Sequence, residues 1–487
     1  MDTQKIQELE PRALWNNFYN ITRVPRPSGK MDEISKFLID FGKNLGLETL
    51  RDDTGNVLIR KPATKGMENR KGVVLQAHMD MVPQKNSDVQ HDFERDPIDA
   101  YIDGKWVKAH GTTLGADNGI GVAAAMAVLQ STDIEHPTVE MFITVDEETG
   151  MDGAFGLKGG LLQGDILLNL DSEEEGELCV GCAGGLDATM TFEYDEEEIE
   201  AGDAALQIDL SGLKGGHSGI DIILQRANAN KLMFRLLKEA VTDYGARLAQ
   251  YDGGNMRNAI PREACAIVTV PTENIDSFID FVNRKRQQFA EEYKGVDDGL
   301  TLSVKKVDLT AGLLPEQVQD DLINAVIACP DGVFRMITEA PDVVETSSNL
   351  AIIKTDGNSV TINALLRSSV ESRKRELAEM FSSLFSIAGA RVEFSGAYPG
   401  WNPNMQSPIL KTMCDTYEKI NGSQPKVVII HAGLECGILG TNYPEMDMIS
   451  FGPTICHPHS PDEKVSIDTV LLFWEYLKQT LANIPLK

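Results

Sequence analysis

Short apolar runs alternate with longer stretches of helical periodicity in the first part of the chain. The run 73–77 ends in His78-Met79-Asp80, a pattern typical of a strand that presents polar side chains at a sheet edge. Residues 11–50 have apolar side chains at helical spacing, which predicts helical structure ending near Gly46. Strands that alternate with helices indicate an α/β layer with a mainly parallel or mixed sheet. We also expect strands over 56–60, 139–145 and 165–170, a hairpin over 97–108 around Asp103-Gly104, and a small-residue helix over 122–129.

The pattern changes near Gly184-Gly185, where strands begin to alternate with long amphipathic helices. After the turn-rich segment 398–403 the first pattern returns, which predicts a second domain inserted into the first. The expected catalytic domain takes residues 1–186 and 398–487, and the expected inserted domain takes 187–397. A cleft is expected where the connections cross. Expected helices of the insertion are 221–241, 275–293, 315–329 and 371–388, and expected strands are 204–210, 264–270, 301–307, 350–355, 359–366 and 391–395.

Length and charge narrow the class of protein. The 487 residues exceed what one hydrophobic core usually holds, so two domains are expected. Acidic residues outnumber basic ones by 74 to 45, for a formal net charge of -29, which argues against nucleic-acid binding. The N-terminal sequence has no apolar signal core, and the chain has no run of about 18 apolar residues, so neither a secretion signal nor a membrane span is expected. We therefore expect a cytoplasmic protein.

The cysteines give no metal-binding signature. Cys179 and Cys182 form a C-x-x-C, but they lie in a segment that predicts a strand, and no second pair completes a zinc knuckle. The odd, scattered set indicates free thiols in a reducing compartment, with Cys179 and Cys182 buried.

Five polar segment ends could together form a metal site. Taken singly, each residue has a plain structural explanation, such as a buried histidine, a turn aspartate or a solvated loop. Together they supply nitrogen and oxygen ligands that suit Zn²⁺, Mn²⁺ or Co²⁺, and carboxylates can bridge two ions about 3.5–4 Å apart. The candidates are His78 with Asp80, Asp117, Glu147 with Glu148, Asp171 and His459.

These segments, in their residues and in their order along the chain, resemble those of the M20 family of co-catalytic metallopeptidases. The matching segments are 75–80 (Leu-Gln-Ala-His-Met-Asp), 114–119 (Leu-Gly-Ala-Asp-Asn-Gly), 145–150 (Val-Asp-Glu-Glu-Thr-Gly), 169–173 (Asn-Leu-Asp-Ser-Glu) and 459–463 (His-Ser-Pro-Asp-Glu). Further matching stretches are 213–219, 258–262 and 432–437, so the likeness covers essentially the whole chain. It implies a two-domain α/β fold, with a catalytic domain built on a central mixed sheet and an inserted α+β lid domain. It also implies a homodimer.

The resemblance implies a role for each candidate. His78 and Asp171 would hold one metal ion, Glu148 and His459 the other, and Asp117 would bridge them, with a cis peptide to Asn118. The ions would be two divalent cations, zinc first, with manganese and cobalt as alternatives. His457 lies two residues before His459 and could also reach the metal, although the match to 459–463 favours His459 as the last ligand.

Two further carboxylates are expected to work without binding metal. Asp80 would accept the second N–H of the His78 imidazole and so fix its tautomer. Glu147 would be the general base, which takes a proton from the attacking water and returns it to the leaving amine.

The resemblance also places substrate contacts in the insertion. His217 would donate to the carbonyl oxygen or oxyanion, Arg367 would bind the free carboxylate of the substrate, and Asn258 would add a hydrogen bond. Each could instead be structural, as a hinge histidine, a surface arginine or a turn asparagine. Glu435 and His431 are weaker candidates for the amino end.

The implied activity is metal-dependent hydrolysis of unblocked dipeptides, Xaa-His among them. Within the family the alternatives are deacylation of N-acyl-amino acids and removal of single C-terminal residues from longer peptides. A serine or cysteine hydrolase fits poorly, because the chain has no Gly-x-Ser-x-Gly elbow. A non-enzymatic metal-binding protein would not need a free carboxylate such as Glu147 beside the ligands.

Overall fold

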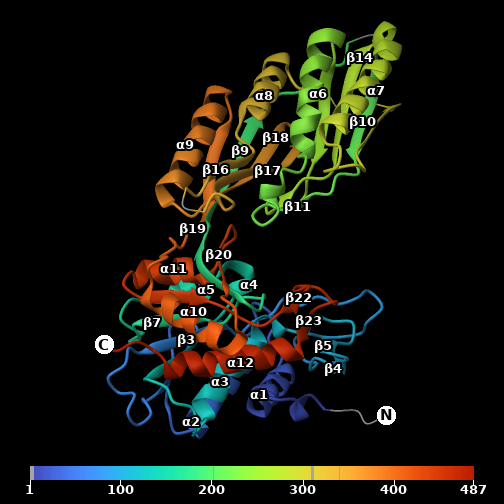
Figure 1. Cartoon of the computed structure of the whole chain (residues 1–487). Helices are drawn as coiled ribbons and strands as arrows, with labels where there is room; N and C mark the ends of the chain where they lie inside the picture. The colour runs from blue at the N-terminus through green and yellow to red at the C-terminus, as the bar shows by residue number, and fades with distance from the viewer. Residues whose placement is uncertain (1–4, 201, 309–311, 339) are drawn as a thin grey trace. The chain divides into compact units, whose positions relative to one another are not determined.

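The structure is a computed structural model that describes residues 5–200, 202–308, 312–338 and 340–487 (Figure 1). The chain divides into two compact units. Unit 1 comprises 1–181, 401–429 and 434–487, and unit 2 comprises 182–400 and 430–433. Unit 2 therefore interrupts unit 1 in sequence. The expected insertion, 187–397, falls within unit 2, and its limits as an independently folding domain remain a prediction.

A mixed sheet forms the centre of unit 1, in the strand order β1-β2-β6-β3-β7-β21-β8-β20. The neighbours β6, β3, β7 and β21 run parallel, while β1 pairs antiparallel with β2, β2 with β6, and β8 with β21. Every residue of β3 is buried, as expected for a strand covered on both faces. The strands are β1 (Glu48–Arg51), β2 (Val57–Lys61), β3 (Val73–His78), β6 (Val139–Thr144), β7 (Ile166–Asn169), β8 (Glu177–Cys182), β20 (Lys426–Ile430) and β21 (Asp447–Ser450).

Helices and a small second sheet complete unit 1. Helix α3 is buried from Ala116 to Leu129 and contacts β3 and β6, because its small side chains allow a close approach to the sheet. The helices are η1 (Ile6–Glu8), α1 (Arg12–Thr22), α2 (Asp32–Asn44), α3 (Ala116–Gln130), α4 (Glu147–Gly150), α5 (Asp152–Gly156), α10 (Pro408–Asn421), α11 (Glu435–Asn442) and α12 (Ile467–Ala482). The small sheet has the order β22-β23-β5-β4 and contains β4 (Ala100–Asp103), β5 (Trp106–Ala109), β22 (Ile455–Cys456) and β23 (Lys464–Ser466).

Unit 2 is an antiparallel sheet with helices α6 to α9 side by side over one face (Figure 1). The strand order is β15-β10-β14-β12-β17-β18-β9-β19, and β16 pairs with β17. The strands are β9 (Gly184–Glu193), β10 (Asp203–Ser211), β12 (Arg247–Gly253), β14 (Ala264–Pro271), β15 (Thr301–Lys306), β16 (Gly332–Met336), β17 (Val344–Asp356), β18 (Ser359–Ser368) and β19 (Arg391–Tyr398), and a separate pair is β11 (Gly216–His217) with β13 (Ala259–Ile260). The helices are η2 (Ile222–Leu224), α6 (Ala229–Tyr244), η3 (Thr272–Asn274), α7 (Ile275–Glu292), α8 (Glu316–Ala328) and α9 (Glu371–Ile387).

The mixed α/β fold and the hairpin around Asp103-Gly104 are confirmed, since Asp103 pairs with Trp106 across that turn. Two predicted helical segments are confirmed only in part. Residues 11–50 form two helices and a strand, because Pro25 and Pro27 lie between α1 and α2 and exclude continuous helix. The segment 221–241 contains the short turn η2, and only from Ala229 does it continue as α6.

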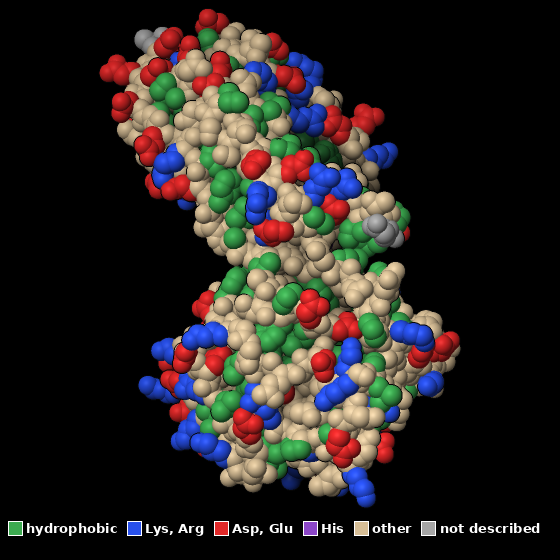
Figure 2. Space-filling model, turned by 90° about the vertical axis from the view of Figure 1, so that its left-hand side faces the viewer, with side chains coloured by type: hydrophobic (Ala, Val, Ile, Leu, Met, Phe, Trp, Pro, Cys, Tyr) green, Lys and Arg blue, Asp and Glu red, His purple; other side chains and the backbone are tan. Residues whose placement is uncertain are grey.

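The surface of each unit mixes both signs of charge on the face drawn in Figure 2, where acidic and basic side chains lie interspersed. Within the described ranges, no helix combines the length and apolar character that a membrane crossing requires.

Candidate metal centre

The predicted ligands of unit 1 lie at the ends of neighbouring elements. His78 is the last residue of β3, and Asp171 follows the end of β7. Asp117 lies in the first turn of α3, and Glu148 lies in α4, just after β6. The strands β6, β3 and β7 are parallel, so their carboxyl ends share one sheet edge, and His459 joins them from the loop between β22 and β23.

Asp117 lies between two ligand groups. Its Oδ1 is 3.1 Å from His78 Nε2, which is also 3.4 Å from Asp171 Oδ1. Its Oδ2 is 3.1 Å from His459 Nε2, which is also 2.9 Å from Glu148 Oε2. The peptide bond from Asp117 to Asn118 is cis, as the resemblance implied.

These residues fit a pair of divalent cations. Ligand atoms about 2.0–2.1 Å from a tetrahedral ion lie roughly 3.3 Å apart, close to the separations just given. Ligand atoms of His78, Asp117 and Glu148 all lie within 4.8 Å of one another. In the described part of the chain, the buried atoms Glu148 Oε1 and Asp171 Oδ1 have no hydrogen-bond donor. Buried carboxylate oxygens without donors are costly unless a cation binds them.

The electrostatics of the site attract positive charge. Hydrogen bonds to Asp117 and Glu148 raise the pKa of His459 to about 11. Burial lowers the pKa of His78, but the charge of Asp171 and hydrogen bonds to Asp117 and Asp80 raise it well above its ordinary value. Burial alone would raise the pKa of Asp117, yet hydrogen bonds from His459 and His78 lower it. These carboxylates stabilise positive charge on His78 and His459, so the cluster is also suited to bind cations.

Asp80 is fully buried behind His78 and contacts more than the imidazole. Its Oδ1 lies 3.4 Å from His78 Nδ1 and accepts the backbone N–H of Glu147 at 3.1 Å. Its Oδ2 accepts from Ser28 Oγ at 2.8 Å and from the backbone N–H of Glu148 at 3.3 Å. His78 Nδ1 also lies 3.2 Å from the backbone oxygen of Asp80. Asp80 therefore ties the end of β3 to the start of α4.

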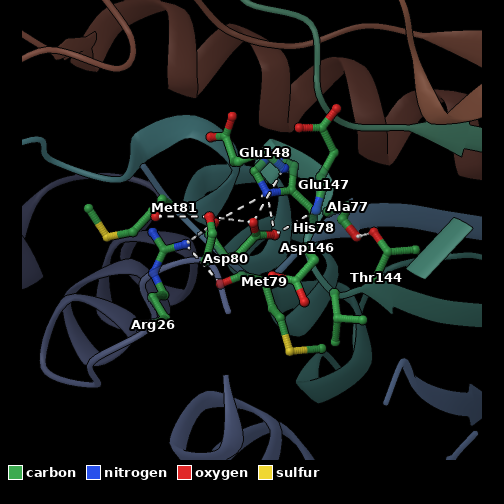
Figure 3. Close-up of polar contacts among 12 residues, drawn as sticks. Arg26, Ala77, His78, Met79, Asp80, Met81, Thr144, Asp146, Glu147 and Glu148 are labelled. Carbon is green, nitrogen blue, oxygen red and sulfur yellow. Dashed lines mark hydrogen bonds and ion pairs between the residues drawn. The ribbon is translucent and has the colours of Figure 1, made fainter. Parts of the chain in front are cut away.

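Glu147 and Glu148 are consecutive, and their carboxylates extend in different directions in Figure 3. Glu148 contacts His459, as described above. Burial raises the pKa of Glu147 well above its ordinary value, and the nearby charge of Asp171 adds to this against the opposing effect of His78. A carboxylate with a raised pKa is suited to accept and return a proton.

Unit 2 brings the three predicted substrate residues together around Ser218. The backbone N–H of Ser218 donates to the carbonyl oxygen of Asn258 at 2.8 Å, and its Oγ accepts from Arg367 Nε at 3.4 Å. Arg367 also donates through Nη1 to Tyr398 Oη at 2.8 Å, and it is 4% exposed. His217 pairs with Ala259, the residue after Asn258.

The tautomer of His217 follows from its backbone contacts. The N–H groups of Gly219 and Ile220 both donate to Nδ1 at 3.1 Å, so the neutral ring carries its proton on Nε2. Burial, with the charge of Arg367, lowers the pKa of His217 to about 4. His217 is thus a neutral Nε2–H donor at ordinary pH. Nearby, His431 Nε2 lies 2.7 Å from Ser347 Oγ.

Sequence patterns did not single out several residues that surround the centre. Arg26 and Glu463 are each 2% exposed and hydrogen-bond to the backbone of the ligand-bearing loops. Ser28 holds Asp80, as described above. Of these three residues, only Glu463 had a signal, because it lies in the recognised segment 459–463. Glu435, the weaker candidate for the amino end of the substrate, is buried against Gln76 and Thr144, with distances of 2.6 and 2.9 Å.

Comparisons with known proteins agree with this geometry. The profile described as peptidase family M20/M25/M40 matches residues 74–483. The cytosol non-specific dipeptidase of Escherichia coli (strain K12) is 47% identical over 483 residues, which cover 99% of this chain and 100% of the relative. The crystal structure of aminoacylhistidine dipeptidase from Vibrio alginolyticus matches with a TM-score of 0.91 and 49% identity over 99% of both chains. Aminopeptidase PepT from Bacillus cereus ATCC 10987 matches with a TM-score of 0.57 at 17% identity, over 98% of this chain and 99% of its own, and shows the shared fold alone.

Proposed function

The chain belongs to peptidase family M20/M25/M40, and from that premise we infer that it is a dipeptidase that hydrolyses the peptide bond of unblocked dipeptides. Peptidases of this family are metal-dependent, and the ligand cluster of unit 1 suits that chemistry. The observation that best supports the proposal is the position of Asp117, whose two oxygens each face a separate histidine.

We propose that unit 1 holds two ions, with zinc as the first candidate and manganese or cobalt as alternatives. His78, Asp171 and one oxygen of Asp117 would hold the first ion. His459, Glu148 and the other oxygen of Asp117 would hold the second. When bound, such ions polarise the scissile carbonyl and make the attacking water more acidic.

Glu147 would carry the proton transfers. Its carboxylate would accept a proton from the attacking water and then deliver it to the nitrogen of the leaving amine. Its raised pKa supports this role, because a stronger base removes the proton more readily. Asp80 would support it from behind, since it accepts the backbone N–H of Glu147 and faces His78.

We propose that residues of unit 2 recognise the substrate. The Arg367 guanidinium would bind the C-terminal carboxylate of the dipeptide, for which a planar fork of donors is suited. The His217 Nε2–H would donate to the scissile carbonyl oxygen, and Asn258 would add a hydrogen bond. Arg367 and Asn258 both hydrogen-bond to Ser218, and His217 precedes Ser218 in the chain, which supports a common task.

We also propose a cytoplasmic homodimer. The cytoplasm is supported by the name of the Escherichia coli relative, and the dimer by the family resemblance. Sedimentation of the purified protein tests the second point: a monomeric mass at micromolar concentration would contradict it.

A substrate panel tests the proposed function. The purified protein, loaded with Zn²⁺, Mn²⁺ or Co²⁺, is assayed on Gly-His and β-Ala-His, on N-acyl-amino acids, and on tripeptides. We expect hydrolysis of the free dipeptides only. Turnover of N-acyl-amino acids alone would indicate a deacylase, and release of single C-terminal residues from tripeptides would indicate a carboxypeptidase. Either result would refute the dipeptidase assignment.

A further inference from the structure

A buried arginine lies directly behind the predicted metal ligands. Arg26 is 2% exposed, and Figure 3 shows its guanidinium beside the backbone of Met79 and Asp80. Its Nη1 donates to the carbonyl oxygens of Met79 at 3.0 Å and Asp80 at 2.9 Å, and its Nη2 donates to that of Gly115. Arg26 thus links the end of the strand that carries His78 to the loop that carries Asp117.

A buried glutamate holds the N–H groups of that same loop. Glu463 Oε2 accepts from the backbone N–H of Leu114 at 2.7 Å and of Gly115 at 3.0 Å. Its Oε1 accepts from Ala116 at 2.7 Å and from Asp117 at 3.3 Å. Four consecutive N–H groups therefore point at one carboxylate, and the last belongs to the predicted bridging residue. Because Glu463 follows His459 by four positions, it also ties the His459 loop to the Asp117 loop.

We propose that Arg26 and Glu463 are positioning residues, which together set the separation of His78, Asp117 and His459 that a pair of metal ions requires. The inference rests on the proposed function, because it names the residues that hold the backbone around the same metal centre. Arg26 holds carbonyl oxygens and Glu463 holds N–H groups, so loop 114–117 is held through both kinds of backbone group. Neither side chain touches substrate or metal in this account.

Two glycines of the loop support a specific fit around Arg26. A Cβ at Gly115 would lie within 2.4 Å of Arg26 Nη2, and one at Gly119 would lie 2.8 Å from the same atom. These contacts are too close for a real side chain, so glycine at both positions leaves room for the guanidinium. In the described part of the chain, no carboxylate oxygen lies within 4.0 Å of Arg26, which distinguishes it from an ordinary ion-paired arginine.

The test compares Arg26→Lys and Glu463→Gln with the wild-type protein. Lysine keeps the charge but cannot reach three carbonyl oxygens in the planar geometry of a guanidinium. Glutamine keeps the shape but replaces one acceptor oxygen with an N–H₂ group that faces two N–H groups. We expect each variant to lose metal affinity by about ten- to a hundredfold, the usual effect of removing a residue that orients metal ligands. The readouts are Zn²⁺ competition with a chelator and the visible spectrum of the Co²⁺-loaded protein. At saturating metal we expect kcat to fall while KM for the dipeptide stays unchanged.

Matched controls come from elsewhere in unit 1. Glu140 is also buried and accepts from Arg60 and from the backbone N–H groups of Gln163 and Gly164, so Glu140→Gln removes similar bonds away from the centre. Arg70 donates to the carbonyl oxygen of Ile484, so Arg70→Lys is the control for the arginine. We expect both controls to keep wild-type metal affinity and Co²⁺ spectra, even where their melting temperatures fall.

The outcomes separate this inference from the proposed function. If Arg26→Lys and Glu463→Gln bind metal as the controls do, the positioning role is refuted. Wild-type metal affinity in Arg26→Lys would by itself refute the role of Arg26, because the positive charge of the side chain would then be sufficient without the geometry of the guanidinium. If Glu463→Gln does not fold, Gly119→Ala provides the second test, since its methyl group displaces Arg26 without touching a ligand. A wild-type protein that binds no metal or hydrolyses no dipeptide would instead overturn the proposed function.

Discussion

Replacing Asp80 with asparagine should weaken metal binding although no predicted ligand is changed. The carboxylate accepts two backbone N–H groups and the Ser28 hydroxyl, and it lies 3.4 Å from His78 Nδ1. Burial would raise the pKa of Asp80, but the hydrogen bond and charge of His78 lower it, so Asp80 is an anion at neutral pH. The substitution keeps the shape of the side chain and removes both the charge and one acceptor.

The size of the effect follows from these contacts. If the new N–H₂ group takes the place of Oδ2, the Ser28 hydroxyl can turn to accept, and only the bond from the Glu148 N–H is lost. If it takes the place of Oδ1, the bonds to Glu147 and His78 are lost together. The first arrangement therefore costs least, and losing one hydrogen bond to a charged group costs about 1.5–3 kcal/mol. Since 1.4 kcal/mol is tenfold in affinity, we expect the metal Kd to rise roughly ten- to a hundredfold.

Competition of Zn²⁺ with a chelator measures this Kd, and steady-state hydrolysis of Gly-His at saturating Zn²⁺ measures kcat. The matched control is Asp146→Asn, because Asp146 lies beside Glu147 but accepts the Gly29 N–H at 2.6 Å and the Thr149 hydroxyl at 3.5 Å, whereas the N–H groups of Glu147 and Glu148 donate to Asp80. We expect the control to keep wild-type metal affinity. If Asp80→Asn binds Zn²⁺ as tightly as the control and retains full kcat, Asp80 does not orient the site.

Three further predictions concern metal, pH and stability. Removal of metal by a chelator should abolish hydrolysis and lower the melting temperature. For an ion present at a hundred times its Kd, the expected loss of folding stability is about 2.7 kcal/mol. Zn²⁺, Mn²⁺ or Co²⁺ should restore activity and melting temperature, and an active metal-free protein would contradict the account. His217→Asn should lower kcat/KM about 10²–10³-fold without moving the acidic limb of the pH profile, because the pKa of His217 is lowered to about 4 and the ring stays neutral from pH 5 to 8; a shifted limb would show that His217 titrates there. Asp331→Asn should raise the melting temperature at pH 8 but not at pH 4. Burial raises the pKa of Asp331 to about 6, so the folded state favours the neutral acid and the wild type loses stability as pH rises from about 4 to 6; equal shifts at both pH values would exclude this cause.

Local chemistry explains which features the sequence could predict. The apolar run before His78 predicts a buried strand because both faces of β3 are covered. Asp103-Gly104 predicts a hairpin, and the two-residue turn is Gly104-Lys105, where the glycine takes the positive φ of 60° that such a turn requires. By contrast, the prediction of helical structure over 11–50 missed the break between α1 and α2, although Pro25 and Pro27 lie in it.

The surroundings of the centre were less predictable, for a physical reason. Arg26 contacts only backbone carbonyl oxygens, and any residue supplies those, so no pattern of partner side chains points to it. Glu463 likewise accepts only backbone N–H groups. Asp80 could be assigned to His78 by resemblance, but its bonds to the N–H groups of Glu147 and Glu148 depend on how β3 and α4 meet. Such contacts arise from the fold rather than from residue spacing.

The central claim is that unit 1 holds metal ions beside a separate general base, Glu147. The most direct test is one preparation of Glu147→Gln, in which metal content by atomic emission and kcat on Gly-His are measured together. We predict that the variant keeps the metal content of the wild type while kcat falls about 10²–10⁴-fold, the usual contribution of a positioned base. A variant that keeps its metal and full activity would contradict the claim.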